Sequence, residues 1–307
     1  MSNIKILDCT LREGGYINDW NFGKDEILSI LDSLNKAKLD YVEAGYLKDN
    51  AFHNSNKSVF SDISQLCAYN YSNLFLMINY GEVKIENLND TTIGLSIAFK
   101  KKDYIDALEY CSELVEKGFK IFINPMSINL YSFEELDEII EKINSIYPFA
   151  LSIVDSFGAM NEQDIIQTFN FINSKLDKNI ALSLHLHDGL NQAMSAVKKI
   201  ITLEKNREII IQTSLNGIGR GVGNLKTEDF VELNKFSLPY NKKSEYELAV
   251  YRLSARKNIH PNYAKLLIEN KVLLSKCDKL LDEIPKEYRA IFSKKILEEK
   301  IKYYPVG

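Results

Sequence analysis

Short apolar runs of strand length alternate along the chain with segments whose apolar residues recur at helical spacing. Residues 27–34 and 136–143 illustrate the helical segments, because their Ile and Leu residues mostly fall three or four positions apart. This alternation predicts parallel strands joined by crossover helices, and eight units in about 225 residues favour a closed (β/α)8 TIM barrel over an open doubly wound sheet. The eight runs of strand length are residues 4–8, 41–45, 74–78, 93–98, 120–124, 150–155, 181–187 and 209–214.

The pattern changes over residues 244–305, which are rich in Leu, Ile, Lys and Glu and carry few strand signals. X-Pro pairs at 260–261 and 284–285 divide this segment into several helices. The sequence therefore predicts a barrel domain over residues 1–238 and a C-terminal helical extension over residues 239–307. No Pro/Gly/Ser-rich linker joins the two, so we expect the extension to pack on the barrel. Its amphipathic helices also predict a homodimer that forms through this extension.

One predicted helix start in the extension carries two residues of types that often act in catalysis. His260 and Tyr263 flank Pro261, and proline is favoured at the first position of a helix. We therefore interpret this segment as a proline-initiated helix with Tyr263 packed inward. A functional role for His260 and Tyr263 is the alternative.

Charge and cysteine content narrow the classes of partner. The chain has 38 Lys and Arg against 42 Asp and Glu, a net charge of −4, so we expect no surface for nucleic acid. We also expect no membrane partner, because no apolar stretch approaches membrane-spanning length and the start carries no signal segment. The four cysteines, at positions 9, 67, 111 and 277, form no C-x-x-C pair, which favours a reducing cytoplasm. A small-molecule partner fits best.

The first strand ends in a cluster of charged residues. Asp8, Arg12 and Glu13 lie within six residues and are followed by Gly14 and Gly15. Barrel enzymes build their active sites at such carboxyl ends of strands. From this segment alone, however, a surface loop with a local Arg–Glu contact is the favoured interpretation.

The seventh run carries two of the four histidines of the chain, His185 and His187. Side chains in a strand alternate between its faces, so the two imidazoles point the same way. Neutral imidazoles are common metal ligands, and such a pair needs only a carboxylate and a water or substrate to complete a site. The pair therefore predicts a divalent metal site rather than two structural core histidines.

Two other strand ends carry candidate groups. Asp155 closes the sixth run, where it could orient an arginine, accept a hydrogen bond or cap the following helix. A glycine-rich loop follows the eighth run at residues 216–224, and its G-x-G-x-G-x-G spacing differs from a Rossmann fingerprint. A phosphate-binding loop is a competing interpretation of this segment.

Taken together, five segments resemble the pyruvate carboxyltransferase-like enzymes, or DRE-TIM metallolyases. This superfamily contains the HMG-CoA lyases, the isopropylmalate and homocitrate synthases and the 4-hydroxy-2-oxovalerate aldolases. The resemblance covers residues 4–235 and implies a TIM barrel with a divalent metal, Mn²⁺ or Mg²⁺ first and Zn²⁺ or Co²⁺ as alternatives. The matching segments, in the same order as in that superfamily, are 8–14, 43–45, 155–158, 185–187 and 216–228.

The resemblance implies a role for each matching residue. Arg12 stands where the superfamily has the arginine that stabilises an enolate oxygen. Glu13, His185 and His187 stand where it has metal ligands, and a glutamate in the first of these places looks like the homocitrate synthases. Asn224 lies in a Gly-Asn-Leu-Lys-Thr-Glu-Asp segment whose asparagine can complete the metal sphere in the lyases.

Other positions bear on the choice of reaction. Tyr16 stands where the aldolases have a basic histidine, and a tyrosine with the ordinary pKa near 10 is a poor base unless the metal or Arg12 lowers it. We expect Asp8 and Asp155 to position Arg12 and the loop. Residues 154–160 look closest to the aldolases, and the glycine-rich loop lacks the cysteine of the CoA lyases.

The resemblance therefore implies aldol cleavage or condensation of a 4-hydroxy-2-oxo acid through a metal- and Arg-stabilised enolate of pyruvate or a similar 2-oxo acid. A 2-oxo acid and an aldehyde would be the small-molecule partners. A Claisen-type acyltransferase that joins an acyl-CoA to a 2-oxo acid is the second hypothesis. An epimerase or isomerase of a sugar-like substrate is the third, and a non-catalytic binding protein is the least favoured.

Overall fold

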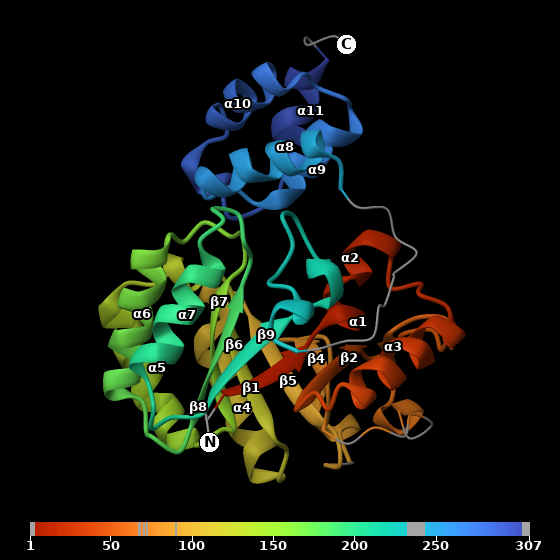
Figure 1. Cartoon of the computed structure of the whole chain (residues 1–307), viewed down its shortest axis with the longest axis vertical. Coiled ribbons are helices and arrows are strands. Elements are labelled where there is room, and N and C mark those ends of the chain that lie inside the picture. Colours follow the sequence, from red (N-terminus) through yellow and green to blue (C-terminus); the bar gives the residue numbers. More distant parts are fainter. Residues whose placement is uncertain are drawn as a thin grey trace.

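Eight parallel strands close into a barrel in the computed structural model of the chain (Figure 1). Strand β1 (Ile4–Asp8) pairs with both β9 (Ile209–Thr213) and β2 (Tyr41–Leu47), so the ring is complete and the predicted (β/α)8 barrel is confirmed. From β2 the ring continues through β4 (Leu74–Asn79), β5 (Gly94–Phe99), β6 (Ile121–Pro125), β7 (Ala150–Asp155) and β8 (Ala181–Leu186). The structure describes residues 4–66, 69, 71, 73–89, 91–231 and 243–302.

The strand boundaries follow the apolar runs to within a residue or two. The predicted strands at 93–98 and 120–124 each begin and end one residue later. A short additional strand, β3 (Val59–Phe60), pairs with the carboxyl end of β2 and was missed by the sequence analysis. A strand of two residues is too short to show alternation, so periodicity could not reveal it.

Helices surround the barrel between most strands. The polar side chains of Ser132 and Asn161 form capping boxes that start α5 and α6. Two short helices, α1 (Thr10–Glu13) and α2 (Gly15–Asn18), follow β1 at the carboxyl end of the barrel. The longer helices around the strands are α3 (Lys24–Lys36), α4 (Tyr104–Glu116), α5 (Phe133–Ile146), α6 (Glu162–Lys175) and α7 (Ala193–Leu203).

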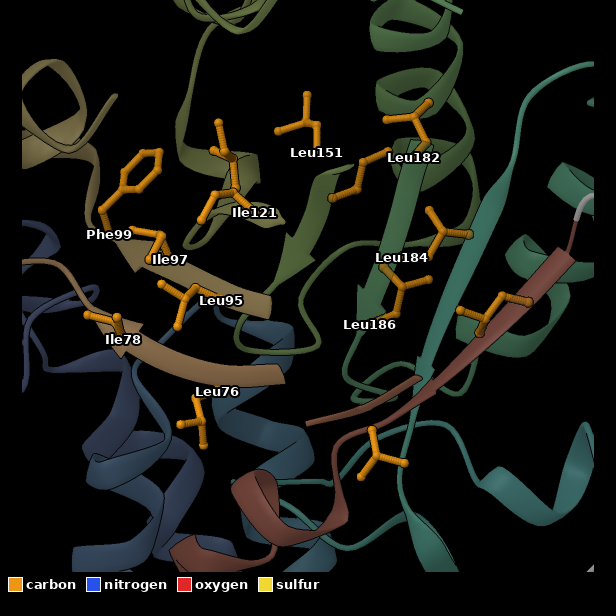
Figure 2. Close-up of a cluster of buried hydrophobic side chains, with 14 of the residues drawn as sticks. Leu76, Ile78, Leu95, Ile97, Phe99, Ile121, Leu151, Leu182, Leu184 and Leu186 are labelled. Atoms are coloured by element: carbon orange, nitrogen blue, oxygen red, sulfur yellow. The ribbon is translucent and has the colours of Figure 1, made fainter. Parts of the chain in front are cut away.

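Alternate side chains of the strands form two separate apolar layers. The outward-facing set, with Leu76, Ile97 and Leu184 among its members, packs under the helices (Figure 2). A smaller set including Phe75 and Phe122 forms its own cluster. Most members of this second cluster stand at the first or second position of their strands, so they fill the amino end of the barrel. The carboxyl end carries polar side chains beside a small further apolar cluster.

The extension forms a helical cluster with its own core, over the carboxyl end of the barrel (Figure 1). The Phe157 ring, after β7, meets the His260 ring edge-on with 5.5 Å between centroids, and Arg252 donates to Asn191, after β8, at 3.2 Å. The extension therefore packs on the barrel, as expected, while the predicted boundary at 238/239 lies outside the described residues. Its helices are α8 (Glu245–Arg256), α9 (Pro261–Glu269), α10 (Leu274–Asp282) and α11 (Lys295–Ile301).

The proline-initiated helix with an inward tyrosine is confirmed. Pro261 stands in the first turn of α9, and the His260 side chain accepts a hydrogen bond from the Asn262 N–H. Tyr263 is fully buried and donates its hydroxyl to the Ile291 carbonyl at 3.1 Å. The buried ring and its satisfied hydroxyl give Tyr263 a packing role in the core of the extension.

The structure bears on the expectations about the cysteines and about membrane-spanning helices. Cys9, Cys111 and Cys277 are free and buried, whereas Cys67 lies outside the described residues. Among the helices of the described residues, none combines the length and the apolar character that a membrane crossing requires.

Candidate metal centre

Glu13, His185 and His187 converge at the carboxyl end of the barrel. The Glu13 carboxylate oxygens lie 3.6 Å from His185 Nε2 and 3.9 Å from His187 Nε2. One ligand atom of each residue falls within 4.8 Å of the other two. The structure thus brings together the three residues that the sequence analysis nominated as principal metal ligands.

Local structure explains this convergence. His185 lies in β8 and His187 follows its last residue, so the two rings lie on one side of the extended chain, 5.1 Å apart. Glu13 ends the short helix α1, which turns directly out of β1. All three residues are at most 5% exposed, so solvent does not screen their interactions.

Burial keeps both imidazoles neutral. Burial lowers the pKa of His185 to about 3 and holds the pKa of His187 well below its ordinary value. At neutral pH each ring therefore retains a lone pair for a cation. The Arg220 carbonyl lies 3.2 Å from His187 Nδ1, and a proton on Nδ1 satisfies this carbonyl and leaves the Nε2 lone pair facing Glu13.

Asn224 adds an unsatisfied oxygen to the cluster. Its backbone pairs with that of His187, and its Nδ2 donates to the Ile218 carbonyl at 3.0 Å, while its buried Oδ1 has no hydrogen-bond partner. A buried acceptor without a partner is costly, unless a ligand satisfies it. One carboxylate, two neutral imidazoles and this amide oxygen form a donor set that fits a divalent cation.

The glycine at position 219 makes room for this donor set. A Cβ atom at Gly219 would lie 2.2 Å from Asn224 Nδ2 and 2.9 Å from the Glu13 carboxylate. The next residue, Arg220, donates its backbone N–H to Glu13 Oε2 at 3.2 Å. The glycine-rich loop therefore approaches the cluster with its main chain, which only glycine permits.

Arg12 lies beside the cluster and is held by two carboxylates. Its guanidinium contacts Glu13, and its Nε donates to Glu43 Oε2 at 2.6 Å. Burial is the largest single influence and opposes the charge on Arg12, but Glu43 and other neighbouring groups together outweigh it, so the pKa of Arg12 lies above its ordinary value. The sequence analysis listed Glu43 in a matching segment without a role. A charged residue inside the apolar run 41–45 was the available signal.

The expectation that Asp8 and Asp155 position Arg12 is wrong, because the carboxylate partners of Arg12 are Glu13 and Glu43. Asp8 instead accepts the Thr227 hydroxyl at 2.5 Å, which ties β1 to the segment after the glycine-rich loop.

Asp155 closes its own turn by accepting the N–H groups of Ala159 and Met160, both at 3.0 Å. It is also not the N-cap of α6, a position that Asn161 takes. Both aspartates therefore hold loops in place, which is the part of the expectation that the structure bears out.

The buried Asp8 carboxyl gives a prediction on pH. Burial raises its pKa to about 6, above the 3.8 of an exposed aspartate, so the folded chain holds a proton that the unfolded chain releases. This contribution to stability is full below about pH 4 and is lost as pH rises through about 6.

Relative to Asp8→Asn, the wild-type free energy of unfolding should therefore fall by up to about 3 kcal/mol between about pH 4 and pH 8. Urea denaturation of both proteins, stripped of metal by a chelator, measures this difference. Asp32→Asn, at an exposed site on α3, is the control. A difference between wild type and Asp8→Asn that stays constant with pH would contradict the prediction.

A cavity of about 50 Å³ opens beside the cluster. This space accommodates a few waters or a small molecule. The Tyr16 side chain, 37% exposed, lies at its rim and its hydroxyl is 2.9 Å from the Tyr46 hydroxyl. The lining residues are Arg12, Glu13, Tyr16, Tyr46, Met77, Asn79, Ala98, Asn124, Met126, Val154, Ser156, His185, His187, Gln212 and Arg220.

Asn124 is a lining residue that the sequence analysis missed. Its side chain is 4% exposed, and its Nδ2 is buried without a hydrogen-bond partner. The residue ends an apolar run and gives no pattern of its own, so only the closed barrel reveals it. An unpaired donor in this wall suits an oxygen atom of a bound small molecule.

Comparisons with known proteins find chains of similar sequence. A 2-isopropylmalate synthase from Oceanobacillus iheyensis is 24% identical over 262 residues, which are 78% of this chain and 49% of that protein. The chain thus spans about half the length of the curated synthases it matches.

Two solved structures share the fold. The N-terminal domain of a candidate aldolase from Bacteroides vulgatus has a TM-score of 0.60 at 24% identity and covers 73% of this chain and 77% of that one. The HMG-CoA lyase of Bacillus subtilis has a TM-score of 0.59 at 14% identity and covers 84% of this chain and 92% of that one. At such identities these likenesses show the fold alone. The HMGL-like family model, by contrast, matches residues 3–241, and the chain therefore belongs to the HMGL-like family, a family of enzymes with lyase and synthase members.

Proposed function

We propose that the chain is a divalent-metal-dependent carbon–carbon lyase. In this proposal it cleaves a 4-hydroxy-2-oxo acid into pyruvate, or a similar 2-oxo acid, and an aldehyde. The observation that carries the proposal is the convergence of Glu13, His185 and His187, with Arg12 beside them, on one small cavity. A cation site next to a buried guanidinium is the arrangement that stabilises an enolate.

The proposed metal ligands are Glu13, His185, His187 and Asn224. A bound divalent ion supplies a Lewis acid that polarises the ketone of the 2-oxo acid. Mixed oxygen and nitrogen donors suit Mn²⁺, with Mg²⁺ next and Zn²⁺ or Co²⁺ as alternatives.

Arg12 and Tyr16 would serve the reacting atoms. When the C3–C4 bond breaks, its electron pair moves to the ketone oxygen and forms an enolate, which the Arg12 guanidinium stabilises. The proton of the C4 hydroxyl leaves to Tyr16, or to a water that Tyr16 holds, and C4 becomes the aldehyde carbon. Tyr16, or that water, then returns the proton to the enolate carbon to give pyruvate, so the reaction needs no net proton and no oxidant or reductant. Tyr46, whose hydroxyl is 2.9 Å from that of Tyr16, extends the path of proton transfer.

The direct test is release of pyruvate from 4-hydroxy-2-oxopentanoate. We expect release with added Mn²⁺ and none after chelation, measured by a coupled lactate dehydrogenase assay. Release that continues unchanged in the presence of the chelator would sink the proposed mechanism.

A Claisen-type acyltransferase is the second candidate, because the matched curated relatives include isopropylmalate and homocitrate synthases. The two reactions share the metal and the enolate chemistry and differ in the product. Free CoA released from acetyl-CoA and a 2-oxo acid, detected with a thiol reagent, would favour this candidate over the aldolase.

Tyr16→Phe tests the proton transfer. Loss of the hydroxyl should lower kcat for pyruvate release by about 100-fold, the range typical of a lost general acid–base group, with little change in metal binding. Steady-state kinetics and metal titration measure the two effects. Tyr147→Phe, at a half-exposed tyrosine that follows the last residue of α5, is the matched control. Equal kcat values for wild type and Tyr16→Phe would remove Tyr16 from the mechanism.

A further inference from the structure

A second pocket, here named the outer pocket, lies between the glycine-rich loop and the extension. Its volume is about 320 Å³, and helices α8 and α9 form its outer wall. In Figure 1 the teal loop after β9 rises toward these blue helices. The lining residues are Tyr16, Ile17, Gly219, Arg220, Gly221, Lys243, Glu247, Tyr251, Pro261, Asn262 and Lys265.

The outer pocket adjoins the metal cavity. Tyr16 and Arg220 line both spaces, and the Arg220 guanidinium lies 5.6 Å from the centroid of the Tyr16 ring. The inner cavity, at about 50 Å³, has room for little beyond a small 2-oxo acid. A longer substrate would therefore place its distal end in the outer pocket.

Cationic side chains dominate the outer pocket. Arg220, Lys243 and Lys265 line it against a single acid, Glu247. Glu247 is already engaged, because its carboxylate accepts the Ser244 N–H at 2.6 Å in the capping box of α8. The amino end of α9, with its positive end of the helix dipole, also opens here. The charge of the lining therefore suits an anion.

Two of the three cations keep donors free for a ligand, whereas Lys265 pairs with Glu269 on α9 at 4.0 Å. Among the described contacts, Arg220 and Lys243 form no ion pair with a carboxylate. The Arg220 Nη2 rests against the His260 ring, which burial keeps neutral by lowering its pKa to about 3. Lys243 donates to the carbonyls of Gly219 and Gly221, which leaves one of its three protons.

The main chain of the glycine-rich loop is less available to an anion. The N–H groups of Gly217, Gly223 and Asn224 bond to carbonyls of the same region, and that of Arg220 bonds to Glu13. A phosphate cradle made of this backbone, the alternative considered from the sequence, therefore has few donors left. Side chains from the loop and the extension supply the donors instead.

We propose that the outer pocket binds the phosphate group of a phosphorylated aldehyde, the carbon fragment that the lyase releases or condenses. This inference rests on the proposed lyase function and names its substrate class. A phosphate group carries about two negative charges and three acceptor oxygens at neutral pH, which match three cations and one acid. Arg220 stands at the junction of the two spaces and holds the phosphate end away from the metal centre.

Binding of glycerol 3-phosphate, an unreactive analogue of such an aldehyde, tests the inference. Calorimetry is done on the full chain stripped of metal, so the result does not depend on catalysis. We expect saturable binding of glycerol 3-phosphate and none of glycerol. Arg220→Gln and Lys265→Met should each weaken binding by about tenfold or more, as loss of a charge-assisted hydrogen bond predicts. Lys279→Met, at an exposed lysine on α10, is the matched control and should bind like wild type.

The outcomes separate the two proposals. Pyruvate release from an unphosphorylated substrate without binding of glycerol 3-phosphate would overturn this inference and leave the lyase function standing. Equal binding by wild type, Arg220→Gln and Lys265→Met, or tighter binding of glycerate than of glycerol 3-phosphate, would also overturn it. Specific binding of glycerol 3-phosphate without any pyruvate release would support the phosphate pocket and count against the lyase.

Discussion

His185→Ala is expected to abolish metal-dependent pyruvate release while the barrel stays folded. The substitution removes one of three converging ligand groups and leaves Glu13 and His187 unable to enclose a cation. Loss of a residue that merely orients a ligand already costs about 10–100-fold in metal affinity or activity, so loss of a ligand should cost more. Calorimetric titration with Mn²⁺ and the pyruvate assay measure the two losses.

The fold should tolerate this change because the packing and backbone pairing of the residues around His185 hold β8 in place. Leu184 and Leu186 are fully buried, and β8 keeps its backbone pairing with β7 along six residues. Circular dichroism should therefore match wild type. His53→Ala, at an exposed histidine, is the control for removal of an imidazole. Retained metal-dependent activity in a folded His185→Ala protein would rule out His185 as a ligand.

Much of the barrel could be predicted from the sequence because parallel strands are buried on both faces. Such strands appear as continuous apolar runs, so all eight were located within a residue or two. The sequence did not predict β3, because this strand has only two residues, which pair with the last two residues of β2. The extension was visible as amphipathic helices, but its position over the barrel mouth depends on contacts such as Phe157 with His260, which no periodicity encodes.

Some features of the candidate site could likewise be predicted from the sequence, and others could not. The shared face of His185 and His187 follows from strand geometry, and their convergence with Glu13 follows from strand ends that meet at one edge. Pairings between distant residues could not be inferred. Arg12 pairs with Glu43, 31 positions away, as well as with its neighbour Glu13. Asp8 accepts from Thr227, 219 positions away, as well as from the nearby Thr10 N–H. Such distant pairings depend on which side chains share a buried space in the folded chain.

Arg12→Lys should lower kcat for pyruvate release by about 100- to 1,000-fold, as loss of a donor to a developing oxyanion does in other enzymes. Lysine keeps the positive charge but lacks the planar fork that lets Arg12 contact Glu13 and Glu43 together. We therefore expect Mn²⁺ affinity to change much less than kcat. This separation distinguishes Arg12, which would stabilise the enolate, from His185, which would hold the metal.

Arg207→Lys is the matched control for Arg12→Lys. Arg207 is 1% exposed and donates to the carbonyls of Leu176, Asp177 and Ile180 near the amino end of the barrel, away from the metal centre. Its replacement should lower the free energy of unfolding, since buried carbonyls lose their donors, and should leave kcat unchanged. Steady-state kinetics and urea denaturation of both variants test the contrast. A fall in kcat of the same size in Arg207→Lys would mean that Arg12 acts through stability alone, whereas a fall confined to Arg12→Lys assigns the enolate oxygen to its guanidinium.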